Sequence, residues 1–401
     1  MSPPRRTASR GRAARQDSLR HHNLALTLRQ VLDAPSPVSR ADIAAATGLT
    51  RATVSALVDR LLAARLVAEL EPVASQRAGR PAVPLAPARG TVAAVGMEIN
   101  VDYLGVRAID LGGRVLTERV ELGDFRGSNP EVVLDRLAAL ADPVLTLLSD
   151  EGVMIAGTAL ALPGLVDSIT GPLRLAPNLR WRDVDVVGIL TADPVLAGMP
   201  PRLANEANLA ARAEARVRRG SPSSFVYVSG EVGVGGAIVL HGAIYAGRHG
   251  WSGEIGHTVL GTAGSFDEGG TLESYAGQDA ILERAGLPRS ATVGDLVAAG
   301  QRHEPRVLEA LAAAGSALGV ALANMVNIVD VEHVVLGGIF ADLAEYLSEP
   351  VLAQLERRVI TAPWSAIELS VAQAGQYPAM TGAALEVLQT LVEEPAGWLL
   401  T

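Results

Sequence analysis

The chain has 401 residues, of which 49% are apolar and only 3% aromatic, and its net charge is −9. This length accommodates two or three domains, and the residue usage favours helices packed on sheets over an aromatic-rich β-sandwich. The absence of cysteine excludes disulfides, thiolate metal sites and a cysteine nucleophile. The sequence shows no run of eighteen apolar residues and no secretory leader, so we expect a cytoplasmic protein with no membrane partner.

Positive charge is concentrated at the N-terminal end of the chain. Residues 1–90 contain fourteen arginines against six acidic residues, so the rest of the chain is strongly acidic. A basic segment on an acidic body predicts a head that binds a polyanion. Within it, residues 1–20 are predicted to be a disordered basic arm, which acts as a solubilising tail or touches phosphates. The arginines of this arm that lack any periodicity are Arg5, Arg6, Arg10, Arg12 and Arg15.

The pattern of residues 21–88 predicts a winged helix-turn-helix. A helical repeat of apolar residues begins after Asn23 and is ended by prolines at 35 and 37. Ser39 is placed to cap a helix over 40–46, and Gly48 allows the tight turn that follows. Thr50 then caps a second helix over 51–63, whose apolar residues form one stripe. Two short helices joined through such a turn are typical of DNA-binding proteins.

Polar side chains gather at the start of the second helix, and a basic loop follows it. The loop lies between predicted strands at 67–70 and 83–85, and its arginines suit the negative potential of a minor groove. The alternative is a helical module that only mediates protein contacts. The turn, the wing and the charge balance together favour double-stranded DNA as the partner. The predicted DNA-binding residues are Thr50, Arg51, Thr53, Ser55, Arg77 and Arg80.

From residue 89 onward the sequence predicts a two-lobed α/β body. Three strands, a helix, a further strand and another helix follow one another, and this order then occurs a second time. We therefore expect a first lobe over 89–200 and a second over 201–401, with the C-terminal helix returning to the first lobe. Small ligands commonly bind in the cleft between two lobes.

Several segments of the body resemble the ROK family of repressors and sugar kinases. They are Pro163 to Asp167 (PGLVD), Pro177 to Trp181 (PNLRW), Gly250 to His257 (GWSGEIGH) and the pair Leu272-Glu273. The resemblance covers roughly residues 20–390. The N-terminal helix-turn-helix fits the family's transcriptional regulators, because its kinases lack one. The resemblance implies an actin-like, hexokinase-like (ribonuclease H-like) fold and assembly into a homodimer or homotetramer.

The resemblance also implies a sugar site in the cleft, built from carboxylates and amides. These groups suit a sugar, because carboxylate oxygens accept hydrogen bonds from neighbouring hydroxyls. Taken singly, each residue is equally compatible with a solvated acid or a satisfied core histidine. The implied sugar-binding residues are Asn205, Glu206, Glu254, His257 and Glu273, with Gly164 and Asn178 as further lining residues.

Three departures from the family's kinases predict that the chain is not an enzyme and has no catalytic residue. The kinase phosphate loop Asp-x-Gly-Gly-Thr is replaced by Glu98 to Asp102 (EINVD), which loses both glycines and adds carboxylates that repel phosphate. The second loop, usually starting Gly-Thr-Gly, carries Glu231 in place of the hydroxyl. The position of the catalytic Asp holds Glu206, whose extra methylene displaces the base by about an ångström.

A fourth departure removes the family's structural zinc. Relatives hold it with the histidine of Gly-His and three cysteines, and those cysteines are replaced here by Gly264, Phe266 and Thr271. His257 alone is a poor tetrahedral site. We therefore expect no metal and no cofactor, and packing of Phe266 is a candidate substitute for the zinc.

The sequence as a whole predicts a repressor of carbohydrate-metabolism genes whose DNA affinity depends on a sugar in the cleft. Repression relieved by a free sugar is the expectation that the resemblance carries. Three alternatives stay open: an active sugar kinase with a DNA-binding head, a regulator whose cleft takes no sugar, and a scaffold that uses the head for protein contacts.

Overall fold

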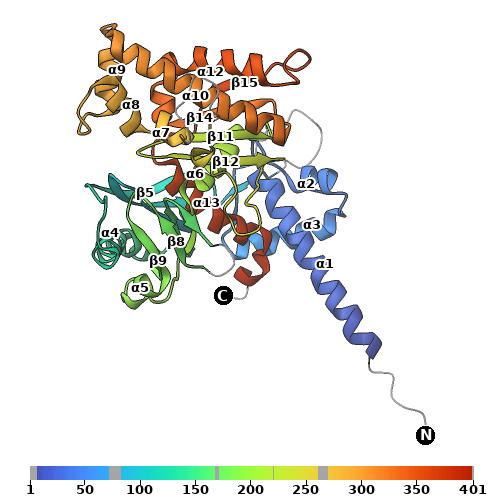
Figure 1. The fold of residues 1–401 in the computed structure, drawn as a ribbon. Coiled ribbons are helices and arrows are strands. Elements are labelled where there is room, and N and C mark those ends of the chain that lie inside the picture. Colours follow the sequence, from blue (N-terminus) through green and yellow to red (C-terminus); the bar gives the residue numbers. More distant parts are fainter. Residues whose placement is uncertain (1–6, 72–82, 168–170, 220, 261–269, 400–401) are drawn as a thin grey trace.

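The structure is a computed structural model that describes residues 7–71, 83–167, 171–219, 221–260 and 270–399. It consists of a small helical head and a body of two α/β lobes (Figure 1). The mixed α/β class and the head-plus-body organisation agree with the sequence prediction.

The head is a winged helix-turn-helix. Its elements are α1 (Thr7–Leu32), α2 (Arg40–Thr47), α3 (Arg51–Ala63), β1 (Val67–Glu69) and β2 (Leu85–Pro87). The two strands pair antiparallel, and the loop that joins them includes residues 72–82, outside the described part. Helix α1 begins at Thr7, so the prediction of a disordered arm is wrong from this residue onward. The N-terminal part of α1 has no apolar stripe, so its sequence lacks the periodicity that predicts a helix.

Local signals set the ends of α2 and α3 where the sequence predicted them. Ser39 and Asp42 form a reciprocal capping box at the start of α2. Gly48 ends that helix with φ +72°, a left-handed conformation that glycine adopts without strain. The Thr50 hydroxyl accepts a hydrogen bond from the Thr53 amide and so caps α3.

The first lobe is built on a five-stranded sheet of order β10-β6-β3-β4-β5. Its central strand β3 is buried along its whole length, and α4 covers one face of the sheet. Strand β10 completes this sheet although it lies beyond the predicted lobe boundary at residue 200. The elements are β3 (Val92–Ile99), β4 (Tyr103–Asp110), β5 (Val115–Leu122), α4 (Pro130–Asp150), β6 (Met154–Leu162), α5 (Val186–Ala192) and β10 (Arg202–Asn205).

The second lobe repeats this plan with a sheet of order β13-β12-β11-β14-β15. In both sheets the first strand lies in the middle, with an antiparallel hairpin on one side and parallel strands on the other. The sheet elements are β11 (Phe225–Gly230), β12 (Val234–Leu240), β13 (Ala243–Ile244), β14 (His333–Gly338) and β15 (Glu368–Val371).

Helices cover the outer face of the second sheet. They are η1 (Ile255–His257), α7 (Leu272–Ala276), α8 (Gln278–Ala285), α9 (Val293–Gln301), α10 (Pro305–Val329), α11 (Ile339–Asp342) and α12 (Ala344–Arg358). Helix α10 is long and apolar enough to cross a membrane by length and composition alone. Its apolar residues form the core of this lobe together with α8 and α12. This packing accounts for its composition.

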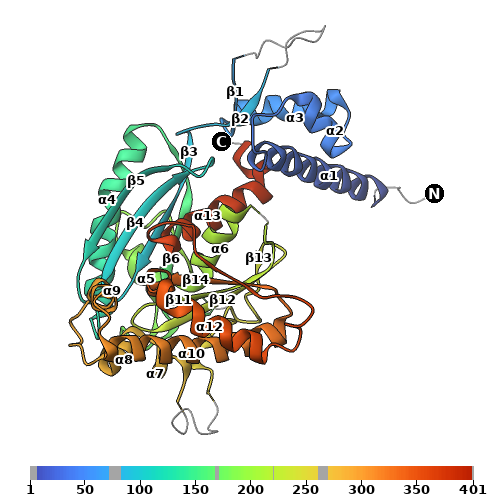
Figure 2. The same ribbon diagram turned by 90° about the horizontal axis from the view of Figure 1, so that it is seen from above.

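Two helices, α6 (Glu206–Arg218) and α13 (Pro378–Glu393), lie between the two sheets (Figures 1 and 2). The C-terminal helix α13 packs on β3, β4 and β6 of the first sheet. Glycines allow this close approach. A Cβ at Gly96 of β3 would lie 1.9 Å from the Met380 carbonyl oxygen, and one at Gly382 would lie 1.8 Å from that of Leu209.

The head shares a hydrophobic core with the body. Leu24 and Leu28 of α1 belong to one buried cluster with Phe225 of β11 and Leu388 of α13. The final turn η2 (Pro395–Leu399) also contacts α1 and α3. Figure 2 shows the head beside the ends of α6 and α13. The head therefore packs directly on α13, and an ion pair between Asp33 and Arg216 links it to α6.

Candidate functional site

A cavity of about 70 Å³ lies between the lobes, where the carboxyl ends of the strands of both sheets meet. All seven predicted sugar-binding residues line it. The first lobe and the start of α6 supply Gly164, Asn178, Asn205 and Glu206, and the second lobe supplies Glu254, His257 and Glu273. The tertiary structure thus brings together residues that lie more than a hundred positions apart in the sequence.

Asn205 connects β10 with α6. Its side-chain oxygen accepts hydrogen bonds from the amides of Ala207 (2.9 Å) and Asn208 (3.2 Å), which caps the helix. Its amide nitrogen donates to the Gly164 carbonyl at 3.1 Å and to the Glu206 carboxylate at 3.0 Å. The structural role of Asn205 is therefore to fix Glu206 at the edge of the cavity.

Gly164 and Asn178 come from a small sheet that the sequence analysis did not predict. This sheet contains β7 (Leu165–Val166), β8 (Leu173–Ala176) and β9 (Trp181–Val184), in that order. Gly164 has φ +97°, and a Cβ there would lie 2.1 Å from a carbonyl oxygen of β8. Asn178 lies in the turn between β8 and β9. The strands are too short to give a clear alternating pattern.

Glu273 approaches the glycine-rich turn between β11 and β12. Its carboxylate accepts a hydrogen bond of 2.9 Å from the Val234 amide. A Cβ at Gly233 would lie 2.5 Å from the Glu273 Oε2 atom and 3.1 Å from the Asn178 Nδ2 atom. The glycine therefore leaves room for polar side chains from both lobes to meet at the cavity.

Glu254 precedes the short helix η1 and His257 is its last residue, and η1 lies against β12. A Cβ at Gly253 would lie 2.3 Å from the Gly236 carbonyl oxygen, so this close approach requires glycine, whose φ here is +98°. The indole of Trp251 donates to the Val166 carbonyl at 2.9 Å and ties this segment to the first lobe. Burial raises the pKa of the Glu254 carboxyl, with the nearby His257 opposing this shift.

A cluster of carboxyl groups lies at the side of the cleft formed by the ends of β3 and β11. The Asn100 amide donates to Glu98 at 3.4 Å and to Glu231 at 2.5 Å. Burial, together with neighbouring carboxylates, raises the pKa of Glu98 to about 7 and that of Glu231 to about 8. Burial likewise raises the pKa of Glu206 well above its usual range. The cleft therefore disfavours further negative charge.

Asn100 and Glu231 line the cavity together with Ser229 but were not among the predicted site residues. The sequence analysis had considered Asn100 and Glu231 only as departures from the kinase loops. The glycine-rich run around Glu231 was the available signal. Its meaning depends on the contact with the end of β3, which lies 131 positions earlier in the sequence.

The predicted DNA-contacting residues of α3 lie at its N-terminal end. Thr50 and Arg51 are exposed, whereas Thr53 and Ser55 are half-buried. The Thr50 and Thr53 hydroxyls lie 2.8 Å apart, so both are partly engaged in capping. Arg60, which the sequence analysis left out, is exposed on the same helix. The wing residues Arg77 and Arg80 lie outside the described residues, and so their role stays a prediction.

The segment for which the resemblance implied a zinc site also lies largely outside the described part, which lacks residues 261–269. Thr271 is described and precedes α7. Among the described residues, no group of three or more His, Cys, Asp or Glu side chains could hold a metal ion. The expectation of no zinc stays a prediction.

Comparisons with known proteins agree on the family. The ROK family model matches residues 95–390, and the MarR family model matches residues 25–80. The chain is 26% identical to the xylose repressor of Bacillus subtilis over 90% of its own length and 94% of the repressor. It is 24% identical to the DNA-binding transcriptional repressor Mlc of Escherichia coli over 92% and 93% of the two chains.

A solved structure agrees with the fold of the whole chain. A ROK family transcriptional regulator described as a homologue of the Escherichia coli Mlc protein matches with a TM-score of 0.77 and 24% identity, covering 95% of this chain and 98% of that one. The chain belongs to the ROK family, and its winged helix-turn-helix places it among the family's DNA-binding transcriptional regulators.

Proposed function

We propose that this protein is a cytoplasmic, homo-oligomeric repressor of carbohydrate-metabolism genes, and that an uncharged sugar in the interlobe cleft controls its affinity for an operator. One observation carries the proposal: seven polar or glycine positions from both lobes line a single cavity, and the helix that begins there forms an ion pair with the DNA-binding head.

The charge of the cleft defines the class of sugar. Glu206, Glu231, Glu254 and Glu273 line it, and none of the described lining residues is an arginine. Carboxyl and amide groups suit the hydroxyls of a neutral sugar, and the acidic groups among them disfavour a phosphate group. Because relatives of the chain are named xylose repressors, xylose is the first sugar to test.

Helix α6 connects the cleft with the head. It begins at Glu206, which lines the cavity, and near its other end Arg216 forms an ion pair of 3.2 Å with Asp33 of the head. The cavity of about 70 Å³ is small for a monosaccharide, so a bound sugar requires the lobes to separate. A sugar that binds the separated arrangement more tightly shifts the protein toward it and moves the head through α6.

Kinase activity with a DNA-binding head is the alternative, and the carboxyl cluster argues against it. Glu98 and Glu231 belong to the two segments that the resemblance aligns with the kinase phosphate loops, and both carboxyls accept hydrogen bonds from Asn100. The first of these segments lacks the Gly-Gly pair that approaches phosphate. A coupled assay for ATP consumption across a panel of sugars tests this alternative directly. Turnover above the rate without sugar would favour the kinase.

Thermal unfolding of the full-length protein tests the sensor function. The panel includes xylose, glucose, N-acetylglucosamine, their phosphates and ATP. A ligand at 100 times its dissociation constant stabilises the folded state by about 2.7 kcal/mol. We expect a shift with a neutral sugar and none with ATP. A shift with ATP, or none with any neutral sugar, would contradict the proposal.

DNA binding is measured on sequences that the protein itself selects from a random pool. We expect a near-palindromic site whose half-sites are about one helical turn apart, because a symmetric dimer presents two recognition helices. The affinity should fall steeply with salt and change when the sugar is added. Salt-independent or absent DNA binding would favour a scaffold.

A further inference from the structure

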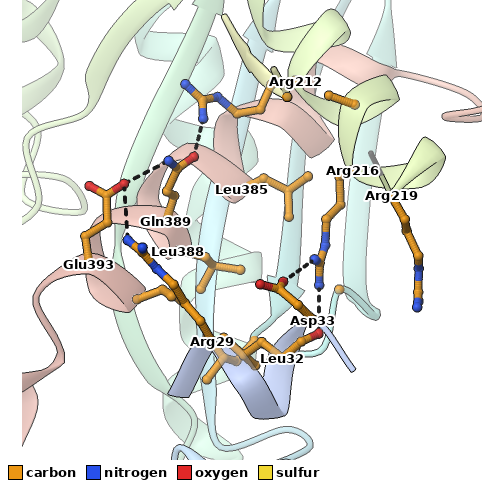
Figure 3. Close-up of a pocket in the computed structure, with 15 residues that line it drawn as sticks. Arg29, Leu32, Asp33, Arg212, Arg216, Arg219, Leu385, Leu388, Gln389 and Glu393 are labelled. Atoms are coloured by element: carbon orange, nitrogen blue, oxygen red, sulfur yellow. Dashed lines mark hydrogen bonds and ion pairs between the residues drawn. The ribbon is translucent and has the colours of Figure 1, made fainter. Parts of the chain in front are cut away.

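A second cavity lies where the head meets the body. It has a volume of about 630 Å³, within the range of typical small-molecule sites. Its walls come from the end of α1, the outer half of α6 and the end of α13 (Figure 3). It is separate from the interlobe cleft, since the two cavities share no lining residue.

Guanidinium groups dominate the charge of this cavity. Arg212, Arg216 and Arg219 follow one another at spacings of four and three residues, so α6 and its C-cap present them on one face. Arg29 of α1 adds a fourth. Two lining residues, Asp33 and Glu393, are acidic. Arginines therefore outnumber the acidic lining residues of this cavity, whereas four acidic residues and no arginine line the interlobe cleft.

Three of these arginines already have partners. Arg216 lies 3.2 Å from the Asp33 carboxylate, and Arg29 lies 3.9 Å from that of Glu393. Arg212 lies 3.5 Å from the Glu386 carboxylate and donates a hydrogen bond to Gln389. The Arg212 Nε atom is buried without a hydrogen-bond partner. Arg219 is exposed and forms no ion pair with any described residue. A buried donor without a partner is unfavourable, and an acceptor in the cavity would satisfy it.

We propose that this cavity binds a phosphorylated metabolite of about monosaccharide size. The planar guanidinium fork matches the geometry of phosphate oxygens, and several forks facing one cavity suit a dianion better than a single carboxylate. The cavity also contains apolar surface from Leu385 and Leu388, against which a sugar ring can lie. The protein thus has separate sites of opposite charge for a neutral sugar and for a phosphorylated compound.

The position of the site gives it a regulatory consequence. Arg29 and Asp33 belong to the head, whereas Arg216 and Glu393 belong to the body, and the two ion pairs between them cross the junction. A phosphate that engages Arg29 and Arg216 competes with these carboxylates and alters the contacts that orient the head. Binding in this cavity therefore changes the affinity for DNA independently of the cleft.

Calorimetric titration of the full-length protein with glucose 6-phosphate tests the proposal. The double variant R212Q/R216Q should weaken binding by about a hundredfold, since each charged hydrogen bond contributes about tenfold. The single variant R219Q should also weaken glucose 6-phosphate binding, and it breaks no ion pair. R219Q therefore still tests the proposal if the double variant fails to fold. The control R182Q/R289Q removes two exposed arginines elsewhere and should bind as the wild type does.

Further titrations identify the ligand class and the site. Inorganic phosphate should bind more weakly than glucose 6-phosphate and depend on the same arginines, and citrate should not bind as tightly as the sugar phosphate. The cleft variant E254Q should leave glucose 6-phosphate binding unchanged. Absence of binding at millimolar concentration, equal affinity in R212Q/R216Q and its control, or loss of binding in E254Q would overturn the proposal.

Discussion

The side-chain amide of Asn100, at the end of β3, donates a 2.5 Å hydrogen bond to the carboxylate of Glu231, in the turn after β11. This bond joins the two lobes across the cleft. It also links the two segments in which the sequence departs from the phosphate loops expected from the family's kinases.

The raised pKa of Glu231 predicts that stability falls as pH rises. In the unfolded chain this carboxyl loses its proton near its ordinary pKa of 4.5, whereas in the folded protein it keeps the proton until about pH 8. The unfolded state therefore binds fewer protons in this window, and rising pH favours unfolding until about pH 8. Glu98, with a pKa of about 7, contributes in the same direction.

The variant E231Q removes the loss of stability that ionisation of Glu231 causes at high pH, and its amide oxygen still accepts a hydrogen bond from Asn100. We expect it to be more stable than the wild type at pH 8.5, by on the order of 1 to 3 kcal/mol, and about as stable at pH 4. Urea unfolding at the two pH values measures the difference. The exposed control E309Q should show no such gain. Equal effects of E231Q at both pH values would contradict the assigned cause.

The variant E254Q is expected to weaken binding of the cleft sugar by about tenfold or more. A carboxylate accepts two strong hydrogen bonds from hydroxyls, whereas the amide replaces part of this capacity with donors. Titration calorimetry with the sugar identified in the thermal panel measures the loss. E309Q serves as the matched control, and an unchanged affinity in E254Q would remove Glu254 from the site.

The variant G253A tests how the Glu254 segment is positioned. Its Cβ would lie 2.3 Å from the Gly236 carbonyl oxygen, and φ at this position is +98°. We expect a loss of stability of about 2 kcal/mol or more together with weaker sugar binding. Gly198 has open space around it and no positive φ, so G198A should be nearly neutral. If G253A matched G198A in both unfolding stability and sugar affinity, the close approach of residue 253 to Gly236 would not be required.

The start of α3 is expected to dominate operator recognition in the described part of the head. The exposed Arg51 has a guanidinium free to reach a phosphate or a base, so R51A should weaken binding by about tenfold. R289A, which removes an exposed arginine of the second lobe, is the control. Fluorescence anisotropy at several salt concentrations distinguishes a phosphate contact of Arg51 from a base contact. Loss of a phosphate contact lowers the slope of log affinity against log salt concentration by about one.

The variant T50A should cost about 1 kcal/mol of stability, because its hydroxyl caps α3. The loss should appear in the unfolding of the whole chain, since the head shares a core with the body. Differential scanning calorimetry is the measurement. A separate low-temperature transition confined to the head would argue against this coupling.

The local sequence alone determined the helix-turn-helix and the order of strands in the body. The capping box at Ser39, the left-handed Gly48 and the Thr50 cap specify the helix-turn-helix through neighbouring residues, so they could be predicted. The repeated strand order predicted two lobes for the same reason. The start of α1 was missed because the segment from Thr7 has no apolar stripe.

Only the tertiary structure decided what the cleft contains and how the head is attached. The resemblance to the ROK family supplied the seven cleft residues, but it gave no sign that Asn100 would donate to Glu231, because that contact joins strands from different lobes. The arginine-lined cavity likewise forms only where α1, α6 and α13 meet. Local propensities act within a few residues, whereas burial and charge pairing depend on which distant segments the fold places side by side.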